Sequence, residues 1–343
     1  MERILVRLPN WLGDLLMARP MLHTLRRAHP TSRILAVGLP AHLDLLSHDG
    51  VLDDAHPWPG DGAGRAALAR VLRAHAPDAA LVLPPSFSSA WFAWRAGARR
   101  RIGYAHELRD PLLTHALKRH PRGELHLSRE YLDLAGALGG AAPDAVSHAG
   151  AGAVAVPALV PPPDAVARAE AVLARILGAG APARPLALLA PAARYGPAKR
   201  WAADRYATVA RALAAHGLQV LVCGVESERA ECEAVAGATG GAAVSLAGAT
   251  DLAAQAALCA RAAVALCNDS GLAHLAAAVG APTVTIFGST SSAWTAPLGP
   301  RVRVIQSAPV CAPCFQRTCR IGTRCLEDVG VGRVTRACLE AAA

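Results

Sequence analysis

The stretch that most constrains the fold runs from Ala262 to Phe287. An apolar segment, Ala262 to Leu266, leads into the polar turn Asn268-Asp269-Ser270-Gly271, and an alanine-rich helical segment then precedes a second apolar run from Pro282 to Phe287. A strand, a helix and a second strand in this order indicate a parallel βαβ unit. Open parallel sheets bind ligands at the carboxyl ends of their strands, which is where this turn lies.

The turn has two interpretations. Asp269 and Ser270 are good N-cap residues, so they can simply begin a helix. The free amides after Ser270, with Gly271 allowing close approach, equally suit a phosphate at the positive end of that helix. His274 follows one turn later and can be a core residue, a cap contact or a ligand to a phosphate. The motif alone leaves these alternatives open.

Strand and helix patterns alternate through the whole chain, which predicts an α/β fold with parallel sheets. The 343 residues suit two domains rather than one core. Residues 139–163 are rich in Gly, Ala and Pro and end in three prolines, so we expect a linker there. We predict an N-terminal domain over residues 1–160, a C-terminal domain over 161–325 and a terminal helical segment over 326–343, with a cleft between the two domains.

The net charge limits the classes of partner that we expect. A net charge of +9, carried largely by arginine, favours an acidic substrate or an anionic membrane surface. The chain shows no zinc-finger histidine pattern, aromatic RNA-binding signature or basic tail, so we expect no nucleic acid partner. Charged residues interrupt the N-terminal apolar stretch, and no apolar run is long enough to cross a bilayer. We therefore expect a cytoplasmic protein with reduced thiols.

The first domain has two groups of candidate residues. Asp14 follows the first strand and either complements the helix dipole or takes a proton from a substrate hydroxyl. From Ser86 to Arg101 the chain is aromatic and basic. Its arginines either form the solvated end of an amphipathic helix or, as a cluster with Arg109, an anion-binding rim.

Candidate residues of the second domain follow its first two strands. The loop Pro191 to Trp201 carries Arg194, Lys199 and Arg200. Loop cations are usually solvated, but these share a sheet edge with the Asp269 turn, so Lys199 and Arg194 could neutralise a diphosphate without a metal. Glu226 and Glu228 follow the next strand and either bind ribose hydroxyls or stabilise the first turn of a helix.

A further group of candidate residues consists of four cysteines near the C-terminus, Cys311, Cys314, Cys319 and Cys325. A C-x2-C pair followed by two more thiols resembles a zinc site, although the later spacings are not those of a standard ribbon. We predict reduced thiols that pack a loop, with a metal site as the alternative.

Four motifs together carry a resemblance over nearly the whole chain. The first spans residues 8–14 and a helix that ends in Arg26-Arg27-Ala28-His29-Pro30; the second is Gly196-Pro197-Ala198-Lys199-Arg200-Trp201; the third is Asn268 to His274; the fourth is the cysteine segment 309–325. In this order and spacing they resemble the ADP-heptose:lipopolysaccharide heptosyltransferases of glycosyltransferase family 9. The fourth motif, with Cys311-x-x-Cys314-Phe315 and Arg317-Thr318-Cys319, is similar to the heptosyltransferase II branch.

The resemblance implies a GT-B fold, in which two Rossmann-like doubly wound domains face a cleft. It implies an inverting glycosyltransferase that needs no metal or other cofactor and moves heptose from ADP-L-glycero-D-manno-heptose to the first heptose of the lipopolysaccharide inner core. Asp14 would be the general base and Lys199 would hold the diphosphate. The full set of implied donor contacts is Arg194, Lys199, Glu226, Glu228, Asp269, Ser270, Gly271 and His274, and the implied acceptor contacts are Asn10, Trp11, Arg95, Arg101 and Arg109.

Further expectations follow from the resemblance. The terminal helix of such enzymes returns to the N-terminal domain, and the acceptor implies peripheral contact with the cytoplasmic face of the inner membrane. Arg194-Tyr195 and the segment 103–109 depart from the family pattern, which leaves the exact acceptor open. The alternatives are a family member with another sugar or acceptor, a catalytically silent ADP-sugar-binding module, and a GT-B-fold epimerase.

Overall fold

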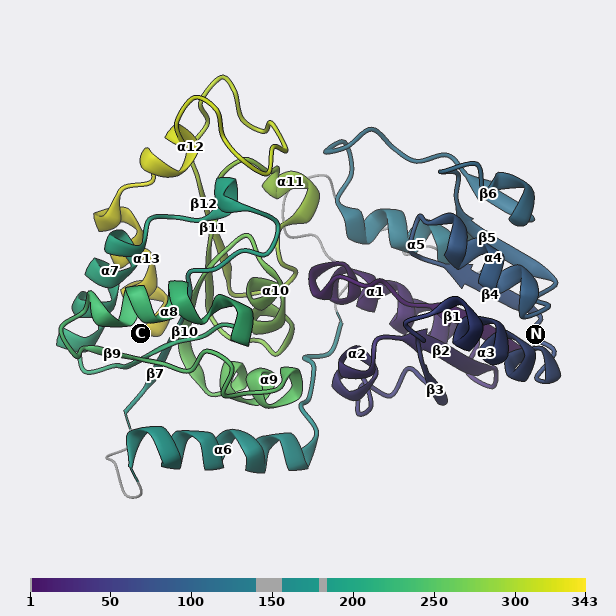
Figure 1. The fold of residues 1–343 in the computed structure, drawn as a ribbon, viewed down its shortest axis with the longest axis horizontal. Helices are drawn as coiled ribbons and strands as arrows, with labels where there is room; N and C mark the ends of the chain where they lie inside the picture. Colours follow the sequence, from purple (N-terminus) through teal and green to yellow (C-terminus); the bar gives the residue numbers. More distant parts are fainter. Residues whose placement is uncertain (1, 140–155, 179–183) are drawn as a thin grey trace. The chain divides into compact units, whose positions relative to one another are not determined.

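The computed structural model describes residues 2–139, 156–178 and 184–343, and the chain divides into two compact units, Met1–Pro157 and Ala158–Ala343 (Figure 1). Most of the predicted linker falls on residues 140–155, outside the described part. No helix among the described residues is long and apolar enough to cross a membrane. Each unit is described here by itself.

The first unit is a six-stranded parallel sheet in the order β3-β2-β1-β4-β5-β6. Its strands are β1 (Arg3–Arg7), β2 (Arg33–Gly38), β3 (Asp54–Pro57), β4 (Ala79–Val82), β5 (Arg100–Tyr104) and β6 (His115–Leu117). Its helices are α1 (Leu12–Ala28), α2 (Pro40–Leu45), α3 (Gly62–Ala74), α4 (Phe87–Arg95) and α5 (Leu127–Ala137), with a 3-10 turn η1 (Asp110–Leu112).

The second unit repeats this plan with the sheet order β12-β11-β10-β7-β8-β9, again parallel throughout. Its strands are β7 (Leu186–Ala190), β8 (Gln219–Val222), β9 (Ala243–Ser245), β10 (Ala262–Asn268), β11 (Thr283–Phe287) and β12 (Val302–Gln306). Its helices are α6 (Pro163–Leu177), α7 (Ala203–Ala215), α8 (Arg229–Gly237), α9 (Leu252–Ala260), α10 (Gly271–Ala278), α11 (Ser292–Thr295), α12 (Arg324–Glu327) and α13 (Val331–Ala342), with 3-10 turns η2 (Pro197–Lys199) and η3 (Glu226–Glu228).

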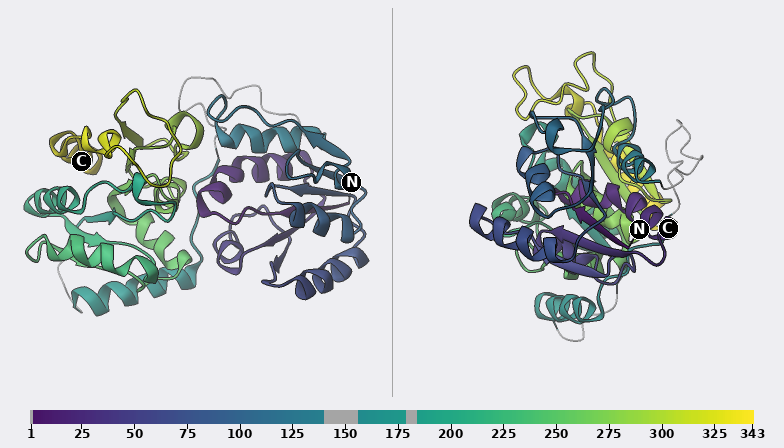
Figure 2. Two further views of the ribbon diagram at one scale, coloured as in Figure 1. Left: turned by 45° about the horizontal axis from the view of Figure 1, so that its top comes forward. Right: turned by 90° about the vertical axis from the view of Figure 1, so that its right-hand side faces the viewer.

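Helices cover both faces of each sheet, as Figure 2 shows, and the alternation of side chains along the strands explains why. In β7, Ala187 and Leu189 join a core with α7, α8 and α13, whereas Leu186 and Leu188 join a core with α6, α9 and α10. In the first unit, Leu5 of β1 packs in one such core, with α3 and α4. Two doubly wound parallel sheets confirm the predicted fold class.

The strand orders place one topological switch point in each sheet. In the first unit the chain moves outward from β1 to β3 and then returns to the other side of β1, so the switch lies between β1 and β4. In the second unit it lies between β7 and β10. Ligands of doubly wound sheets bind in the crevice at this point, outside the carboxyl ends of the strands.

Two elements differ from the sequence-based predictions. β5 and β6 were not expected: β5 begins with Arg100-Arg101, which resembled the basic end of a helix, and β6 has only three residues. A strand can begin with long charged side chains because their ends reach solvent at the sheet edge.

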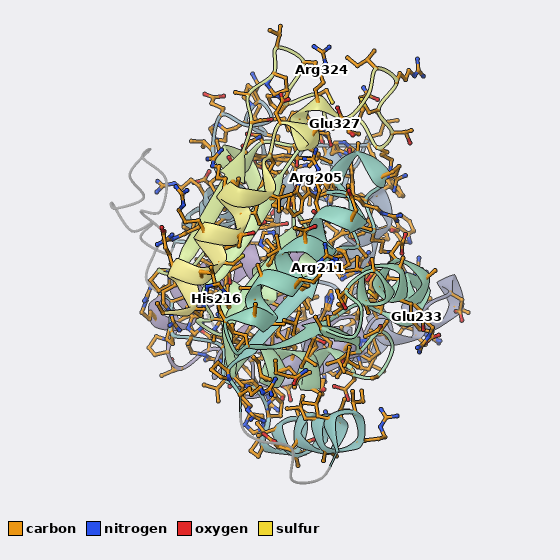
Figure 3. The ribbon with its side chains drawn as sticks, turned by 90° about the vertical axis from the view of Figure 1, so that its left-hand side faces the viewer. Arg205, Arg211, His216, Glu233, Arg324 and Glu327 are labelled. Carbon is orange, nitrogen blue, oxygen red and sulfur yellow. The ribbon has the colours of Figure 1, made fainter. Side chains whose placement is uncertain are left out.

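The C-terminal helix was expected to return to the N-terminal domain, and the structure corrects this. α13 packs against α7, β10 and β11 of the second unit, with Val334 and Cys338 buried in its core. Figure 3 shows α13 beside α7, whose Arg205 donates to the carbonyl oxygens of Leu326, Glu327 and Val329 at 3.3, 2.7 and 3.0 Å. The apolar face of α13 is thereby buried locally, because α7 and the sheet lie next to it.

Candidate functional site

Asn268 joins the two strands on either side of the switch point in the second unit. It ends β10 and is fully buried. Its Nδ2 donates to the carbonyl oxygen of Pro191 at 2.5 Å, and its Oδ1 accepts from the backbone N–H of Trp201 at 3.2 Å. Pro191 and Trp201 begin and end the cationic loop that follows β7. One amide side chain therefore fixes both ends of this loop to β10.

Lys199 lies inside this loop and points at the turn after β10. Its Nζ lies 2.5 Å from Oδ2 of Asp269, and the two side chains are only 12% and 5% exposed. Thr290, which follows β11, donates its hydroxyl to the same carboxylate oxygen at 2.5 Å. Lys199 Nζ also lies 4.7 Å from the centre of the Tyr195 ring, a cation–π contact. The ammonium is thus held in place at the carboxyl edge of the sheet.

Ser270 occupies the N-cap position of α10, but its side chain does not cap the helix. Its Oγ is buried, and no hydrogen-bond partner for it occurs among the described residues. The first amides of any α-helix have no acceptor within the helix, so those of Gly271 and Leu272 face the same edge as Ser270. The turn after β10 therefore fits a bound anion better than it fits a simple helix cap. His274 is buried on α10, one turn further along.

The cysteine segment, residues 309–325, packs against the cationic loop, residues 191–201. Gly196 has φ of 155°, and a Cβ there would lie 2.4 Å from the carbonyl oxygen of Arg317. The same carbonyl accepts from the N–H of Ala198 at 3.1 Å. Tyr195 donates its hydroxyl to the carbonyl oxygen of Phe315 at 2.5 Å. Glycine is required at position 196 because two segments of the chain, the loop after β7 and the segment around Arg317, touch there.

The four C-terminal cysteines, for which a metal site was the alternative, differ in their exposure to solvent. Cys311 and Cys314 are exposed, Cys319 is half-buried and Cys325 is buried. Over residues 2–139, 156–178 and 184–343, no three His, Cys, Asp or Glu side chains gather so that they could hold a metal ion. Burial, with smaller contributions from the other three cysteines, raises the pKa of Cys325, which keeps this thiol protonated.

Glu226 and Glu228 follow β8, which neighbours β7 in the sheet. Oε2 of Glu228 accepts from the N–H of Val225 at 3.1 Å, so this side chain stabilises its own turn. Glu226 is exposed and forms an ion pair with Arg229 at 2.6 Å. Both carboxylates lie at the same sheet edge as Lys199, and both have contacts of their own. Arg194 lies exposed on the loop between β7 and η2.

In the first unit, Asn10, Trp11 and Asp14 lie after β1, beside the switch point. Asp14 is in the first turn of α1, and Trp11 is the N-cap residue and half exposed. Asn10 Oδ1 accepts from Nη2 of Arg7 at 2.6 Å. Burial, with a smaller contribution from Arg65, lowers the pKa of Arg7 to about 9, so this side chain stays cationic at neutral pH.

Asp14 lies close to a buried phenol of α5. Burial, followed by the negative charge of Asp14, raises the pKa of Tyr131. This effect places the carboxylate near the Tyr131 ring, where α1 packs against α5. A carboxylate in the first turn of a helix is also stabilised by the helix dipole.

The other predicted acceptor contacts do not gather around Asp14. Arg109 is fully buried and donates to backbone carbonyl oxygens, to Tyr104 at 2.8 Å and to Pro84 at 2.5 Å. It holds the loops after β4 and β5 together, which does not fit the anion-binding rim. Arg95 ends α4, and Arg101 pairs in register with Ala80 near the start of β4. Both therefore lie toward the amino edge of the sheet, away from the edge that carries Asp14.

Sequence reasoning missed several residues of the site. Asn268 was noted only as part of a motif, and Thr290 and Tyr195 were not considered as site residues. Thr290 had a signal: Gly288-Ser289-Thr290 follows the apolar strand β11, in the position that a polar ligand-binding turn occupies in parallel sheets. The sequence placed Lys199 and Asp269 at the same sheet edge, but it gave no signal that the two side chains form an ion pair, because 70 residues separate them along the chain.

Comparisons with solved structures define the class of protein. The chain aligns with the structure of E. coli ADP-heptose lps heptosyltransferase II with a TM-score of 0.80 and 27% identity, over 100% of this chain and 98% of that one. It aligns with a glycosyltransferase family 9 structure from Veillonella parvula with a TM-score of 0.87 and 21% identity, over 99% and 97% of the two chains, which supports the fold. The class is a glycosyltransferase of the GT-B fold.

Comparisons of sequence then define the family. The model of glycosyltransferase family 9 (heptosyltransferase) matches residues 65–324. Lipopolysaccharide heptosyltransferase 2 of Salmonella typhimurium is 33% identical over 316 residues, which cover 89% of this chain and 88% of that protein. The chain belongs to glycosyltransferase family 9, and it is an enzyme of that family.

The buried amide of Asn268 gives a prediction about stability. Asn268→Ala leaves a buried N–H and a buried C=O without partners, so we expect the free energy of unfolding to fall by about 2–4 kcal/mol. Urea unfolding with an unchanged m-value measures this. Thr208→Ala, at an exposed position of α7, is the control and should change the free energy of unfolding by less than about 0.5 kcal/mol. A loss below about 1 kcal/mol for Asn268→Ala would mean that water replaces the amide and that the loop is not fixed by it.

Proposed function

We propose that this enzyme transfers heptose from ADP-L-glycero-D-manno-heptose to the heptose of the lipopolysaccharide inner core, with inversion at the anomeric carbon. The observation that carries this proposal is the match of 30–33% identity over almost the whole chain to relatives named lipopolysaccharide or lipooligosaccharide heptosyltransferase 2. The site in the second unit supports it, since a fixed cation and a helix N-terminus lie together at a switch point.

On the donor side, Lys199 and the amides of the Asn268–Gly271 turn bind the diphosphate. The leaving ADP carries away the electron pair of the broken bond between the anomeric carbon and oxygen, so negative charge develops on the diphosphate. A held ammonium and helix amides stabilise that charge without reorganisation. We propose that these groups do the work for which other transferases use a divalent cation. The exposed Arg194 and the carboxylates of Glu226 and Glu228 extend the donor site along the sheet edge, toward the ribose.

On the acceptor side, Asp14 accepts the proton of the attacking hydroxyl. The acceptor oxygen forms the new bond to the anomeric carbon while its proton moves to the Asp14 carboxylate. Asn10 and Trp11 lie beside Asp14 after β1 and contact the acceptor sugar. We further propose that the enzyme works in peripheral contact with the cytoplasmic face of the inner membrane, because lipopolysaccharide is a lipid.

The pair of Lys199 with Asp269 gives a sharp test of the donor site. Lys199→Met removes the cation and leaves the Asp269 carboxylate facing the diphosphate, so we expect ADP affinity to fall by about 10²-fold. Lys199→Met combined with Asp269→Asn removes that repulsion and should recover about tenfold. Isothermal titration calorimetry with ADP measures both.

The matched control for this test is Arg200→Gln, which removes a cation of the same loop. Arg200 forms an ion pair with Glu231 and should leave ADP affinity unchanged. Normal affinity of the Lys199→Met protein for ADP would contradict the phosphate assignment. Equal affinities of the single and double variants would remove Asp269 from the electrostatics of the site.

The base assignment is tested by Asp14→Asn. The amide cannot accept the hydroxyl proton, so we expect kcat for transfer to fall by about 10²-fold or more with ADP affinity unchanged. Asp204→Asn is the matched control, because Asp204 is also a carboxylate in the first turn of a helix, α7, and should retain full turnover. Unchanged turnover in the Asp14→Asn protein would exclude Asp14 as the base.

The function itself is tested by a transfer assay with ADP-heptose and two acceptors, inner core without heptose and inner core with one heptose. We expect product by mass spectrometry only with the second acceptor, an inverted linkage by NMR, and unchanged rates with EDTA. Binding of ADP without transfer or hydrolysis would favour the catalytically silent module. Transfer to the heptose-free core, or from another ADP-sugar only, would assign a different acceptor or donor.

A further inference from the structure

Helix α4 presents three aromatic side chains to solvent. Phe87, Trp91 and Trp94 are 45%, 42% and 47% exposed, and their spacing of four and three residues places them on one face of the helix. Phe87 stacks on Trp91 with ring centres 6.2 Å apart, and Trp91 lies 4.8 Å from Trp94. Phe92, on the opposite side, is buried in the core. A continuous aromatic row of this length is unusual on a protein surface that meets only water.

Arginines surround one end of this row. Trp91 and Trp94 line a surface pocket together with Arg70 and Arg73 of α3 and with Arg95, Arg99 and Arg101 around the start of β5. In the described part of the chain, none of the five arginines has an acidic side chain within ion-pair distance.

Two of these five arginines, Arg101 and Arg99, interact with other groups of the chain without forming an ion pair. Arg101 donates to the carbonyl oxygens of Leu112 and Ala98, both at 2.6 Å. The pKa of Asp78 is lowered mainly by hydrogen bonds that its carboxylate accepts from the backbone N–H of Glu2 at 2.7 Å and of Arg3 at 3.2 Å. The charge of Arg99 makes only a smaller contribution. The pocket therefore keeps a strong positive charge that the chain itself does not neutralise.

The arginine pocket is separate from the edge that carries Asp14. The pocket lies where α4 ends and β5 begins, toward the amino edge of the sheet. α3 and α4 share a core with Leu5 of β1, whereas Ile4 and Val6 alternate to the other face of the sheet. The sugar that accepts heptose at Asp14 thus has no direct use for this pocket.

We propose that the row Phe87, Trp91 and Trp94, with the arginine pocket beside it, docks the enzyme on an anionic phospholipid bilayer. Arginine binds phosphate oxygens in two-point contacts, and tryptophan is enriched at the depth of the lipid headgroups. Trp91 lies between Phe87 and Trp94, so its two ring faces are covered by its neighbours and are not open for nucleic acid bases to stack on. This proposal names the surface for the membrane contact that is part of the proposed function. Lipid binding by this surface does not depend on which sugar the enzyme transfers.

The test is cosedimentation of the full-length protein with vesicles of phosphatidylcholine, alone or with 30 mol% phosphatidylglycerol. We expect binding only to the anionic vesicles and loss of binding as salt rises. The triple variant Arg70→Gln, Arg73→Gln, Arg99→Gln should lower the partition coefficient by about 10²-fold at low salt. Trp91→Ser with Trp94→Ser should abolish quenching of tryptophan fluorescence by brominated lipid chains.

The matched control is Arg175→Gln, Arg333→Gln, Arg336→Gln, which removes the same charge from exposed positions of α6 and α13. This protein should bind anionic vesicles almost as well as the unmodified protein. Equal losses in the two triple variants would show that net charge, not this surface, causes binding, and would overturn the proposal. So would a change of oligomeric state on Trp91→Ser with Trp94→Ser, or tight retention of the unmodified protein by single-stranded DNA but not by lipid.

A second readout separates this proposal from the proposed function. Transfer to a delipidated, water-soluble acceptor should be the same for both triple variants, since neither set of residues lies in the donor or acceptor site. Transfer to acceptor embedded in anionic vesicles should fall only for the Arg70, Arg73 and Arg99 set. Failure of transfer to every acceptor, with vesicle binding intact, would reject the proposed function and leave the lipid surface standing.

Discussion

The carboxyl edge of the second sheet depends on one buried amide, that of Asn268. Asn268 supplies two hydrogen bonds at the carboxyl edge of the sheet, one to each end of the loop after β7. A loop of this length, rich in Gly and Pro, has many conformations available to it. Because both ends of the loop are fixed to β10, Lys199 is held at the turn that contains Asp269, and the loop has little conformational entropy left to lose.

The pair of Lys199 with Asp269 has a second consequence. A nearly buried ammonium needs an opposite charge beside it, because removing a charge from water is costly. The Asp269 carboxylate at 2.5 Å holds the ammonium in one position, and the Thr290 hydroxyl donates to the same carboxylate oxygen and orients it. The site is therefore preorganised for negative charge, and its net charge is lower than a count of loop cations suggests.

In the first unit, positive charge is divided between two edges of the same sheet. Arg7 is buried next to the Trp58 ring at 3.9 Å and holds Asn10 beside Asp14 at the carboxyl edge. The arginines around α4 and the start of β5 lie toward the amino edge and remain exposed to solvent or line a pocket. The positive charge of the first unit thus has two different places: Arg7 positions a loop, and the arginines near α4 line a surface pocket.

The sequence by itself determined the two parallel α/β sheets, since the alternation of apolar strands and amphipathic helices is a local pattern that parallel sheets require. It also placed Asp14, Lys199 and the Asp269 turn at strand ends, because polar residues directly after buried strands can lie only at a sheet edge. The tertiary structure alone decided which of these groups touch. Thr290 and Lys199 meet on Asp269, Arg109 turns inward to bind carbonyl oxygens, Arg95 and Arg101 lie toward the amino edge, and α13 stays with the second unit. Each of these outcomes depends on contacts between residues far apart in the chain, which no local pattern encodes.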